Sequence, residues 1–445
     1  MSYDAFDDTT LAFDTQQLHA GYDPGDHNRS KAVPIYHTSA FELGDFDRCQ
    51  RLFSYEEEGH SYVRFSNPTN DVLEKRISAL EGGAAAVSMS SGMAAISNTL
   101  LNLAQAGDEI VAVKTLYGGT TTLLGKVLPD YGIRAGWVED ADDLDTFRAA
   151  ITEKSRAVYI ESLGNPSVNI IDIEAVAGIA HDNGLPLVVD STFATPYLLR
   201  PFDFGADIVC HSATKYISGH GTTIGGLVVE KGGFDWGNGR FPQFERFLDE
   251  SSEFIESRSL HHTAFTRRLR MRYLTEFGGH MSPTTAFLTL HGVETLSLRM
   301  QRHAENALKV AEFLEAHPSV LEVSYPSLPS SPYHELAKKY FPRGSGAILG
   351  IRVRGGLPAV KRVLERVRIF DYMVNVGDTK SLIVHPATSI HHGLSVDAQE
   401  RAGVFQDTLR ISVGTEDAGD LICDLAQALE PLPRIPDLSA RAGGR

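Results

Sequence analysis

From about residue 70 the chain alternates short apolar segments with amphipathic ones, and this alternation constrains the fold more than any other feature of the sequence. DVLEKRISALEGG has a helical period and ends in glycine, whereas EIVAV, AVYIES, PLVVD and DIVCHS are short and apolar, as in a buried sheet. Strands that are separated by helices at this spacing are joined by right-handed crossovers. The sequence therefore predicts an α/β fold in which helices cover both faces of a mainly parallel sheet.

Three regions are predicted along the chain. Residues 1–65 are rich in turn formers and aromatic residues and show little sustained period, so we expect an arm that packs on another subunit. Residues 66–280 contain the alternation, which an irregular, glycine-rich insertion interrupts at 231–260. Residues 281–445 begin with a long helical stretch that we expect to break near Gly292, and continue as a smaller α+β domain with antiparallel strands.

Charge and cysteine content exclude several classes of function. Lysine and arginine number 41 against 57 aspartates and glutamates, and the net charge of −16 disfavours binding to nucleic acid or to an anionic membrane surface. The three cysteines are far apart, so neither a disulfide framework nor a CxxC pair is available. No HExxH or Cys/His spacing predicts a metal site, and no targeting or membrane-spanning segment is evident. We expect a cytoplasmic protein.

Two glycine-rich segments resemble nucleotide-binding motifs without matching them. GGTTTLLGKV has five residues between Gly119 and Gly125, where a P-loop has four, and Val127 stands where a magnesium-binding hydroxyl is needed. GHGTTIGG has one residue too many for a dinucleotide fingerprint and follows no clear strand. A nucleotide-binding enzyme is therefore a weak alternative.

Chemically useful side chains follow two consecutive predicted strands. PLVVD ends in Asp190, and DIVCHS is followed by Ser212, Thr214 and Lys215. The carboxyl ends of parallel strands meet at one edge of a sheet, where open α/β folds bind their ligands. Pyridoxal 5'-phosphate needs a lysine for covalent attachment, an aspartate for its pyridine nitrogen and hydroxyls for its phosphate. These residue types are all available here.

Two further segments fit the same cofactor. Ser90-Ser91-Gly92-Met93 follows an apolar segment and opens a helix, so its free backbone N–H groups can bind a phosphate. Tyr117, in the turn LYGG after another predicted strand, is suitably placed to stack on an aromatic ring. The sequence therefore predicts a pyridoxal-phosphate site built from several strand ends.

The motifs also carry a family resemblance that runs from about Thr15 to Leu432. They are PIYHTSAF, YVRFSNPTNDVLEKRISALEGG, SSGMAA, LYGGT, ESLGNP, VVDSTFATPY, HSATKYISGH and LRISVGTED. On these motifs the chain resembles the fold-type I pyridoxal-phosphate enzymes of cysteine and methionine metabolism, the group of cystathionine synthases and lyases. Within that group its pattern is most similar to the O-acetylhomoserine sulfhydrylases. The resemblance places the cofactor in residues 66–280.

The resemblance implies a role for each matching cofactor residue. Lys215 matches the lysine that carries the cofactor, Asp190 the partner of the pyridine nitrogen, and Tyr117 the ring-stacking tyrosine; these three are the expected catalytic residues. Asn165 matches an asparagine near the ring hydroxyl and the substrate. The phosphate ligands within one subunit match Gly92, Met93, Ser212 and Thr214.

The remaining matches concern a neighbouring subunit and the substrate. Tyr62 and Arg64 match a pair that reaches the phosphate of the next subunit, which implies a homo-oligomer, a tetramer built from dimers that share active sites. Arg410 matches the arginine that binds the substrate α-carboxylate, a task suited to its bidentate fork. Ser381 matches a position that lines the substrate site.

Differences between branches of the family indicate the activity. Gly119 stands where methionine γ-lyases usually have a cysteine, and Lys380 where cystathionine lyases usually have a glutamate. The insertion GGFDWGNGRFPQF also resembles the sulfhydrylases. These features imply γ-replacement in methionine biosynthesis, in which O-acetyl-L-homoserine and sulfide give L-homocysteine and acetate. Cystathionine γ-synthase, cystathionine γ-lyase and methionine γ-lyase activities are the alternatives.

Overall fold

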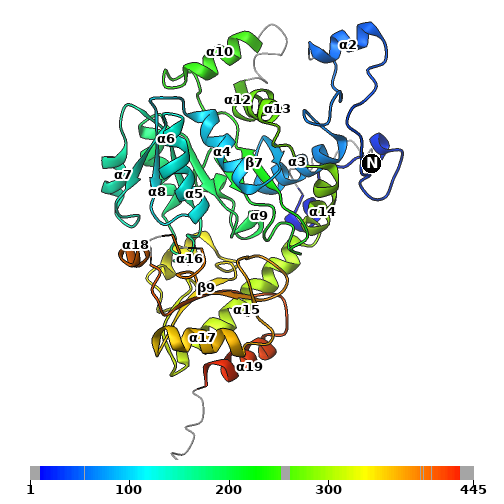
Figure 1. The fold of residues 1–445 in the computed structure, drawn as a ribbon. Coiled ribbons are helices and arrows are strands. Elements are labelled where there is room, and N and C mark those ends of the chain that lie inside the picture. The colour runs from blue at the N-terminus through cyan, green and yellow to red at the C-terminus, as the bar shows by residue number, and fades with distance from the viewer. Residues whose placement is uncertain are drawn as a thin grey trace, which may run out of the picture.

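The computed structural model describes residues 11–54, 56–251, 261–390, 392–393, 395–401 and 403–430. Parts of the predicted arm, insertion and C-terminal domain, namely 1–10, 252–260 and 431–445, lie outside these residues. Two sheets organise the described chain, a larger one in the N-terminal part and a smaller one near the C-terminus (Figure 1).

The larger sheet has seven strands in the order β1-β7-β6-β5-β4-β2-β3. Their bounds are β1 (Ala85–Met89), β2 (Glu109–Val113), β3 (Arg134–Val138), β4 (Ser155–Glu161), β5 (Leu187–Asp190), β6 (Ile208–His211) and β7 (Gly226–Glu230). The strands from β2 to β6 pair in parallel, whereas β7 pairs antiparallel with both β6 and β1. The predicted mainly parallel sheet is thus confirmed, with a reversed strand at one side.

Helices pack on both faces of this sheet. Cys210 and His211 are neighbours on β6, so their side chains point to opposite faces. The Cys210 sulfur lies 3.6 Å from the Thr99 hydroxyl of α4, and the His211 imidazole lies 2.5 Å from the Glu81 carboxylate of α3. The helices of this region are α3 (Pro68–Glu81), α4 (Gly92–Leu103), α5 (Gly118–Thr122), η4 (Leu123–Val127), α6 (Leu128–Asp130), α7 (Leu144–Ala150), α8 (Ile173–Asp182), α9 (Thr195–Leu198), η5 (Pro201–Phe204), α10 (Pro242–Ser251), α12 (Ala264–Arg268), η6 (Leu269–Leu274) and α13 (Thr275–Phe277).

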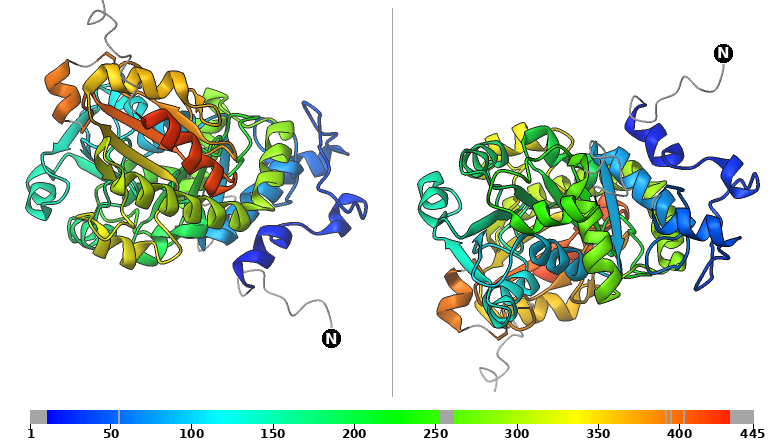
Figure 2. Two further views of the ribbon diagram at one scale, coloured as in Figure 1. Left: turned by 90° about the horizontal axis from the view of Figure 1, so that it is seen from below. Right: turned by 90° about the horizontal axis from the view of Figure 1, so that it is seen from above.

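The N-terminal region contains more regular structure than its sequence predicts. It forms α1 (Phe13–His19), η3 (Pro24–His27) and α2 (Phe46–Phe53). Helix α1 packs against α3 and against α15 (Leu296–Ala316) of its own chain, where Gln17 donates to the Ser297 hydroxyl at 3.0 Å. The segment that carries α2 extends away from the rest of the molecule (Figures 1 and 2). Only part of the arm therefore needs another partner to cover it.

The predicted irregular insertion is also partly ordered. It contains α10, and an aromatic cluster anchors it: Trp236 stacks on Phe244 with ring centroids 4.2 Å apart, and Phe241 and Phe265 complete the cluster. The expectation of an irregular segment was wrong for Pro242–Ser251, which is helical, and the aromatic side chains belong to the main hydrophobic core.

The long helical stretch divides into α14 (Pro283–Val293) and α15 (Leu296–Ala316), close to the predicted break. Gly292 has no room for a side chain, because an added Cβ would lie 2.4 Å from the backbone oxygens of both Ile217 and Ser218. This close approach brings α14 and α15 against the turn that carries Lys215.

Beyond α15 lies the smaller sheet, with the order β10-β11-β12-β9-β8. Its strands are β8 (Val320–Ser324), β9 (Ile348–Val353), β10 (Asp371–Tyr372), β11 (Leu382–Val384) and β12 (Thr408–Ser412), and its helices are α16 (His334–Tyr340), α17 (Gly356–Arg366), α18 (Val396–Arg401) and α19 (Ala418–Leu429). The pairs from β11 to β8 are antiparallel, as predicted. In the described part of the chain, no helix is long and apolar enough to cross a membrane.

Candidate active site

The sheet register brings the predicted residues to one edge of the larger sheet. Asp190, the last residue of β5, is opposite Glu161 of β4 and Cys210 of β6. The segment from Ser212 to Lys215 directly follows β6. Asp190, Ser212 and Lys215 therefore lie where the sequence predicts them, at the ends of two neighbouring parallel strands.

Asp190 is a buried carboxylate without a cationic partner among the described residues. One of its oxygens accepts a hydrogen bond from the Thr192 backbone N–H at 2.9 Å, and the other lies 3.4 Å from the Tyr159 hydroxyl. Burial raises the pKa of Asp190 above its ordinary value. The nearby His211 opposes this rise in the pKa of Asp190, but its ring contacts Glu81. A protonated pyridine nitrogen placed against the Asp190 carboxylate would give it a direct cationic partner.

Lys215 is held by a residue from the other part of the chain. Its Nζ donates to the Asn375 side-chain oxygen at 2.5 Å. Burial, together with the nearby positive charge of Arg410, lowers the pKa of Lys215 to about 8. A much larger fraction of this amine is therefore neutral near pH 7 than is usual for a lysine, as nucleophilic or basic chemistry requires.

Arg410 lies on β12 and is only 4% exposed. Its guanidinium donates to the Asn165 side-chain oxygen at 3.1 Å and to the Asn375 backbone oxygen at 3.2 Å. Burial lowers the pKa of Arg410 to about 10, and no carboxylate of the described residues forms an ion pair with it. A buried guanidinium with only neutral partners fits a carboxylate from a ligand.

The start of α4 lies against Ser212 and forms a cradle for an anion. The Ser91 hydroxyl caps α4 by accepting from the Ala94 N–H at 3.0 Å. An added Cβ on Gly92 would lie only 2.6 Å from the Ser212 Cβ, so a side chain would fill the space between the two segments. Free N–H groups at a helix start, next to hydroxyls, fit a phosphate. This geometry supports pyridoxal phosphate as the ligand.

Thr214 is close to the same segments but its hydroxyl already has partners. It donates to the Gly225 backbone oxygen at 3.2 Å and accepts from the Gly225 N–H at 3.0 Å. The Thr192 hydroxyl accepts from the Ser212 N–H at 2.8 Å and so links the end of β5 to the turn after β6. Thr214 as a phosphate ligand stays a prediction.

Tyr117 directly precedes α5 and is 41% exposed. Its backbone N–H donates to the Glu161 carboxylate at 2.6 Å, which fixes the turn. An added Cβ on Gly119 would lie 2.5 Å from the Tyr117 ring and 3.1 Å from the Met93 sulfur. The ring of Tyr117 and the side chain of Met93 thus meet over Gly119, beside the start of α4.

Ser381, Tyr62 and Arg64 are held by other contacts. The Ser381 hydroxyl is buried, accepts from the Gly414 N–H at 2.8 Å and donates to Glu416 at 2.9 Å. Tyr62 is 41% exposed, and the Arg64 guanidinium lies 5.4 Å from its ring centroid and donates to the Thr275 backbone oxygen. Within one chain, no described hydrogen bond joins either Tyr62 or Arg64 to the Lys215 cluster.

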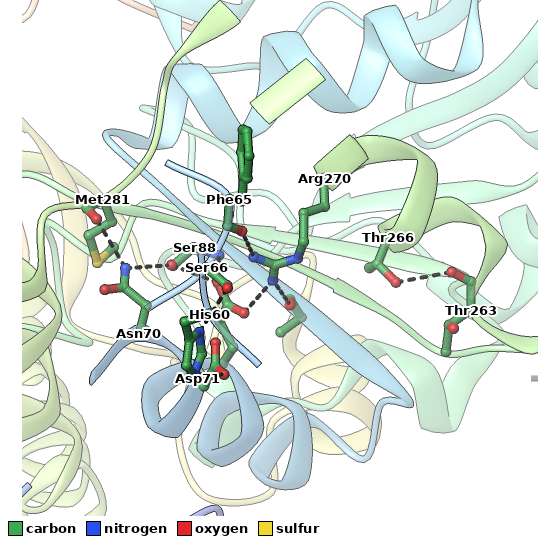
Figure 3. A network of polar contacts seen from close by, with 12 residues as sticks. His60, Phe65, Ser66, Asn70, Asp71, Ser88, Thr263, Thr266, Arg270 and Met281 are labelled. Atoms are coloured by element: carbon green, nitrogen blue, oxygen red, sulfur yellow. Dashed lines mark hydrogen bonds and ion pairs between the residues drawn. The ribbon is translucent and has the colours of Figure 1, made fainter. Parts of the chain in front are cut away.

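A buried polar network anchors the segment that carries Tyr62 and Arg64 (Figure 3). Arg270, on η6, donates to the Phe65 backbone oxygen at 3.0 Å and forms an ion pair with Glu74 of α3. Glu74 in turn accepts from both the N–H and the hydroxyl of Ser88 on β1 at 2.7 Å. The segment is therefore tied to the strand that leads into α4.

Sequence analysis missed two residues of the cluster. Glu161 ends β4 as Asp190 ends β5, so the strand-end rule could have found it. Asn375 belongs to the loop NVGDTKSL, and no local pattern shows that this loop reaches Lys215. An added Cβ on Gly377, in the same loop, would lie 2.7 Å from the Tyr216 nitrogen, so glycine permits this close approach.

The segments that resemble nucleotide motifs have other roles in the fold. GGTTTLLGKV forms the helical turns α5 and η4. GHGTTIGG connects the Lys215 turn to β7. Neither forms a glycine-rich loop between a strand and a helix, so the structure does not favour the nucleotide-binding alternative.

A largely buried lysine, a buried aspartate and a helix start meet at one edge of a mainly parallel sheet, and this arrangement is that of a fold-type I pyridoxal-phosphate enzyme. A family model described as Cys/Met metabolism PLP-dependent enzyme matches residues 14–430, and the chain belongs to this family. The resemblance and the fold class inferred from the sequence are thereby confirmed, as is the cofactor.

Individual relatives are similar over nearly their whole length. The chain is 46% identical to a homocysteine synthase of Schizosaccharomyces pombe over 421 residues, covering 94% of this chain and 98% of the relative. It is 44% identical to an O-acetyl-L-homoserine sulfhydrylase of Leptospira meyeri over 427 residues, covering 94% and 96%. A crystal structure of a proposed O-acetylhomoserine (thiol)-lyase from Campylobacter jejuni, which contains N'-pyridoxyl-lysine-5'-monophosphate, matches with a TM-score of 0.90 at 38% identity and covers 95% of this chain and 100% of the other.

Proposed function

We propose that the protein catalyses γ-replacement on O-acetyl-L-homoserine. In the net reaction the Cγ–O bond to acetate breaks and a Cγ–S bond to hydrosulfide forms, which gives L-homocysteine and acetate. The observation that carries this proposal is the connection of Lys215 to Arg410 through Asn375. It puts a partly neutral amine beside a buried guanidinium that has no carboxylate partner of its own among the described residues. Relatives named homocysteine synthase and O-acetyl-L-homoserine sulfhydrylase support this substrate choice. We propose that the reaction belongs to methionine biosynthesis.

When bound, pyridoxal 5'-phosphate supplies an electron sink conjugated to the Cα of the amino acid. Lys215 would hold the cofactor in the resting enzyme and, once released, take the proton from Cα, since its pKa of about 8 suits a general base near neutral pH. Arg410 would bind the α-carboxylate through its two-pronged guanidinium. Asp190 would keep the proton on the pyridine nitrogen.

The proposed phosphate ligands are Gly92 and Met93 at the start of α4 with Ser212 and Thr214, and Tyr117 would stack on the ring. Asn165 would orient both Arg410 and the ring hydroxyl, since its side-chain oxygen already accepts from Arg410. Ser381 lies on the same loop as Asn375, and its hydrogen bonds to Gly414 and Glu416 would hold this loop at the substrate site.

We further propose that the active site is shared between two copies of the chain, in a tetramer built from such dimers in the cytoplasm. Tyr62 and Arg64 would reach the phosphate of the neighbouring subunit. Arg64 stacks near Tyr62 and Phe65 and has no acidic partner among the described residues, so its charge is available for a phosphate. A site enclosed by two subunits would also exclude water, which competes with sulfide as a nucleophile.

The methionine γ-lyase alternative receives no support from the site. Methionine γ-lyases usually have a cysteine at the position of Gly119, but even a Cβ there would lie 2.5 Å from the Tyr117 ring. A cysteine at this position would displace the ring that is expected to stack on the cofactor. We therefore keep γ-replacement as the function.

The test is a matrix of three acyl donors and three nucleophiles. O-acetyl-, O-succinyl- and O-phospho-L-homoserine would each be assayed with sulfide, cysteine and methanethiol, with Lys215→Ala as the inactive control. We expect O-acetylhomoserine with sulfide to have the highest kcat/KM, with homocysteine and acetate formed in equal amounts. Preferred use of cysteine, or cleavage of cystathionine at a higher rate, would overturn the proposal in favour of the cystathionine enzymes.

A further inference from the structure

Helix α15 presents three buried polar side chains on one face. Arg299, His303 and Asn306 follow one another at intervals of four and three residues, which places them in one row along the helix. They are 7%, 0% and 1% exposed. Buried polar groups need hydrogen-bond partners, and nearly all the partners here are backbone oxygens of the two segments that carry the proposed active-site cations.

Arg299 holds the turn that follows Lys215. Its guanidinium donates to the backbone oxygens of Tyr216 at 2.6 Å and Ile217 at 3.1 Å, and also to that of Gly292 at 2.6 Å. Burial lowers the pKa of Arg299 to about 10, and no carboxylate in the described parts of the chain pairs with it. A further hydrogen bond joins Arg299 Nε to the Thr295 hydroxyl at 3.2 Å, so this cation links the start of α15 to the Lys215 turn and to the end of α14.

Asn306 holds the turn that follows β12, the strand of Arg410. Its side-chain nitrogen donates to the backbone oxygens of Gly414 at 3.1 Å and Glu416 at 2.7 Å. The Glu416 carboxylate then accepts from the Ser381 N–H at 2.7 Å, so the loop leading to Asn375 is tied to the same point. One amide thus connects α15 to the substrate-carboxylate side of the site.

His303 lies between these two ends and touches both. Its Nδ1 donates to the Val413 backbone oxygen at 2.7 Å, and its ring meets the Tyr216 ring edge to face with centroids 5.2 Å apart. Burial lowers the pKa of His303 to about 4, so the ring is neutral near pH 7 and carries its proton on Nδ1. The three side chains form a continuous polar row from the Lys215 turn to the Arg410 strand.

We propose that Arg299, His303 and Asn306 are positioning residues that fix the spacing between Lys215 and Arg410. This rests on the proposed function, in which Arg410 binds the α-carboxylate of the substrate while Lys215 reaches its Cα. The two groups come from different sheets, so only contacts that span both parts of the chain can fix their spacing. Helix α15 makes such contacts directly from its side chains to the backbone of each segment.

The proposal predicts different defects at the two ends of the row. Asn306→Leu removes the contact on the Arg410 side, so we expect KM for O-acetylhomoserine to rise about tenfold or more while the dissociation constant of pyridoxal phosphate stays within about twofold. Arg299→Met removes the contact on the Lys215 side, so we expect the reverse pattern, with cofactor affinity and kcat reduced by about tenfold or more. His303→Leu should show both defects, a raised KM and a reduced cofactor affinity and kcat. His303→Gln keeps a hydrogen-bond donor, so both defects should be smaller in this variant.

Val310→Ala is the matched control, because Val310 is buried on the same helix and contacts neither segment by a hydrogen bond. It should lower Tm without changing KM or cofactor affinity. The proposal would be refuted if Asn306→Leu, Arg299→Met and His303→Leu lowered Tm as Val310→Ala does but left KM, kcat and cofactor affinity unchanged. If Arg299→Met does not fold, Arg299→Lys replaces it, and we expect the same pattern at a smaller magnitude because lysine keeps the charge and part of the hydrogen bonding.

Failure of the proposed function gives a separate signature. In that case the wild-type enzyme would not turn over O-acetylhomoserine with sulfide. Cofactor titration and amino-acid binding, followed by absorbance of the bound cofactor, would still report the two ends of the row independently. Equal effects of Asn306→Leu and Arg299→Met on both measurements would then contradict the positioning role.

Discussion

Gly92→Ala is the substitution whose effect the structure defines most closely. The added Cβ would lie 2.6 Å from the Ser212 Cβ, 2.8 Å from its Oγ and 3.0 Å from its Cα. Since the Cα belongs to the backbone, a rotation of the serine side chain cannot relieve the clash, and either the start of α4 or the Ser212 turn must move. Overpacking of this kind costs roughly 1–3 kcal/mol.

The cost should appear mainly as lost cofactor affinity. Without the cofactor, α4 and the Ser212 turn can move apart, whereas phosphate binding requires both segments to contact the same phosphate group. If the whole strain is transferred to binding, roughly 1–3 kcal/mol corresponds to about a 5- to 150-fold weaker affinity for pyridoxal phosphate. The dissociation constant is measured by titrating the cofactor-free protein and following absorbance.

Gly178→Ala is the control for this experiment. Gly178 lies in the middle of α8, is exposed, and has no atom within 4 Å of an added Cβ. Alanine there should raise the free energy of unfolding by about 0.4–1 kcal/mol and leave cofactor affinity unchanged. An unchanged cofactor affinity in Gly92→Ala, measured beside this control, would refute the assignment of the cradle.

Two further predictions concern buried charges. Arg410→Lys keeps the positive charge but loses the bidentate geometry, so KM for O-acetylhomoserine should rise by about tenfold or more; an unchanged KM would remove Arg410 from the carboxylate site. Glu230 accepts from the backbone of Phe265 and Thr266, and burial raises its pKa to about 7. Between about pH 4.5 and about pH 7 the folded protein thus retains a proton on Glu230 that the unfolded chain has lost. The free energy of unfolding of the wild type, relative to that of Glu230→Gln, should therefore fall by an amount on the order of 3 kcal/mol as the pH rises through this range. Denaturant unfolding of the two proteins, measured in parallel over this pH range, tests the prediction. A difference in the free energy of unfolding that rises with pH, or does not change, would contradict it.

Local rules were sufficient for the part of the site that one sheet provides. Asp190 and Lys215 each follow an apolar strand, and parallel pairing of β5 with β6 necessarily puts their ends side by side. The same rule applied to β4 would have indicated Glu161. Gly92 was found because a small residue follows a strand and begins a helix.

The parts that the sequence could not predict depend on contacts between distant segments. Asn375 reaches Lys215 only because the loop before β11 folds over the Lys215 turn, and sequence spacing carries no information on that approach. Helix α1 is seven residues long and is stabilised by packing on α3 and α15, so its own period is too short to predict it. The aromatic contacts around Trp236 are likewise tertiary, which explains why the insertion was expected to be irregular.

The central claim is that Lys215 carries pyridoxal phosphate at the edge of the larger sheet. Reduction of the purified enzyme with borohydride, followed by proteolysis and mass spectrometry, tests it directly, because the reduced cofactor stays bound to the lysine that held it. We predict a pyridoxyl phosphate group on the peptide that contains Lys215, at close to one group per chain, and none in Lys215→Ala. Modification of a different lysine, or retention of the bound cofactor and activity in Lys215→Ala, would contradict the account.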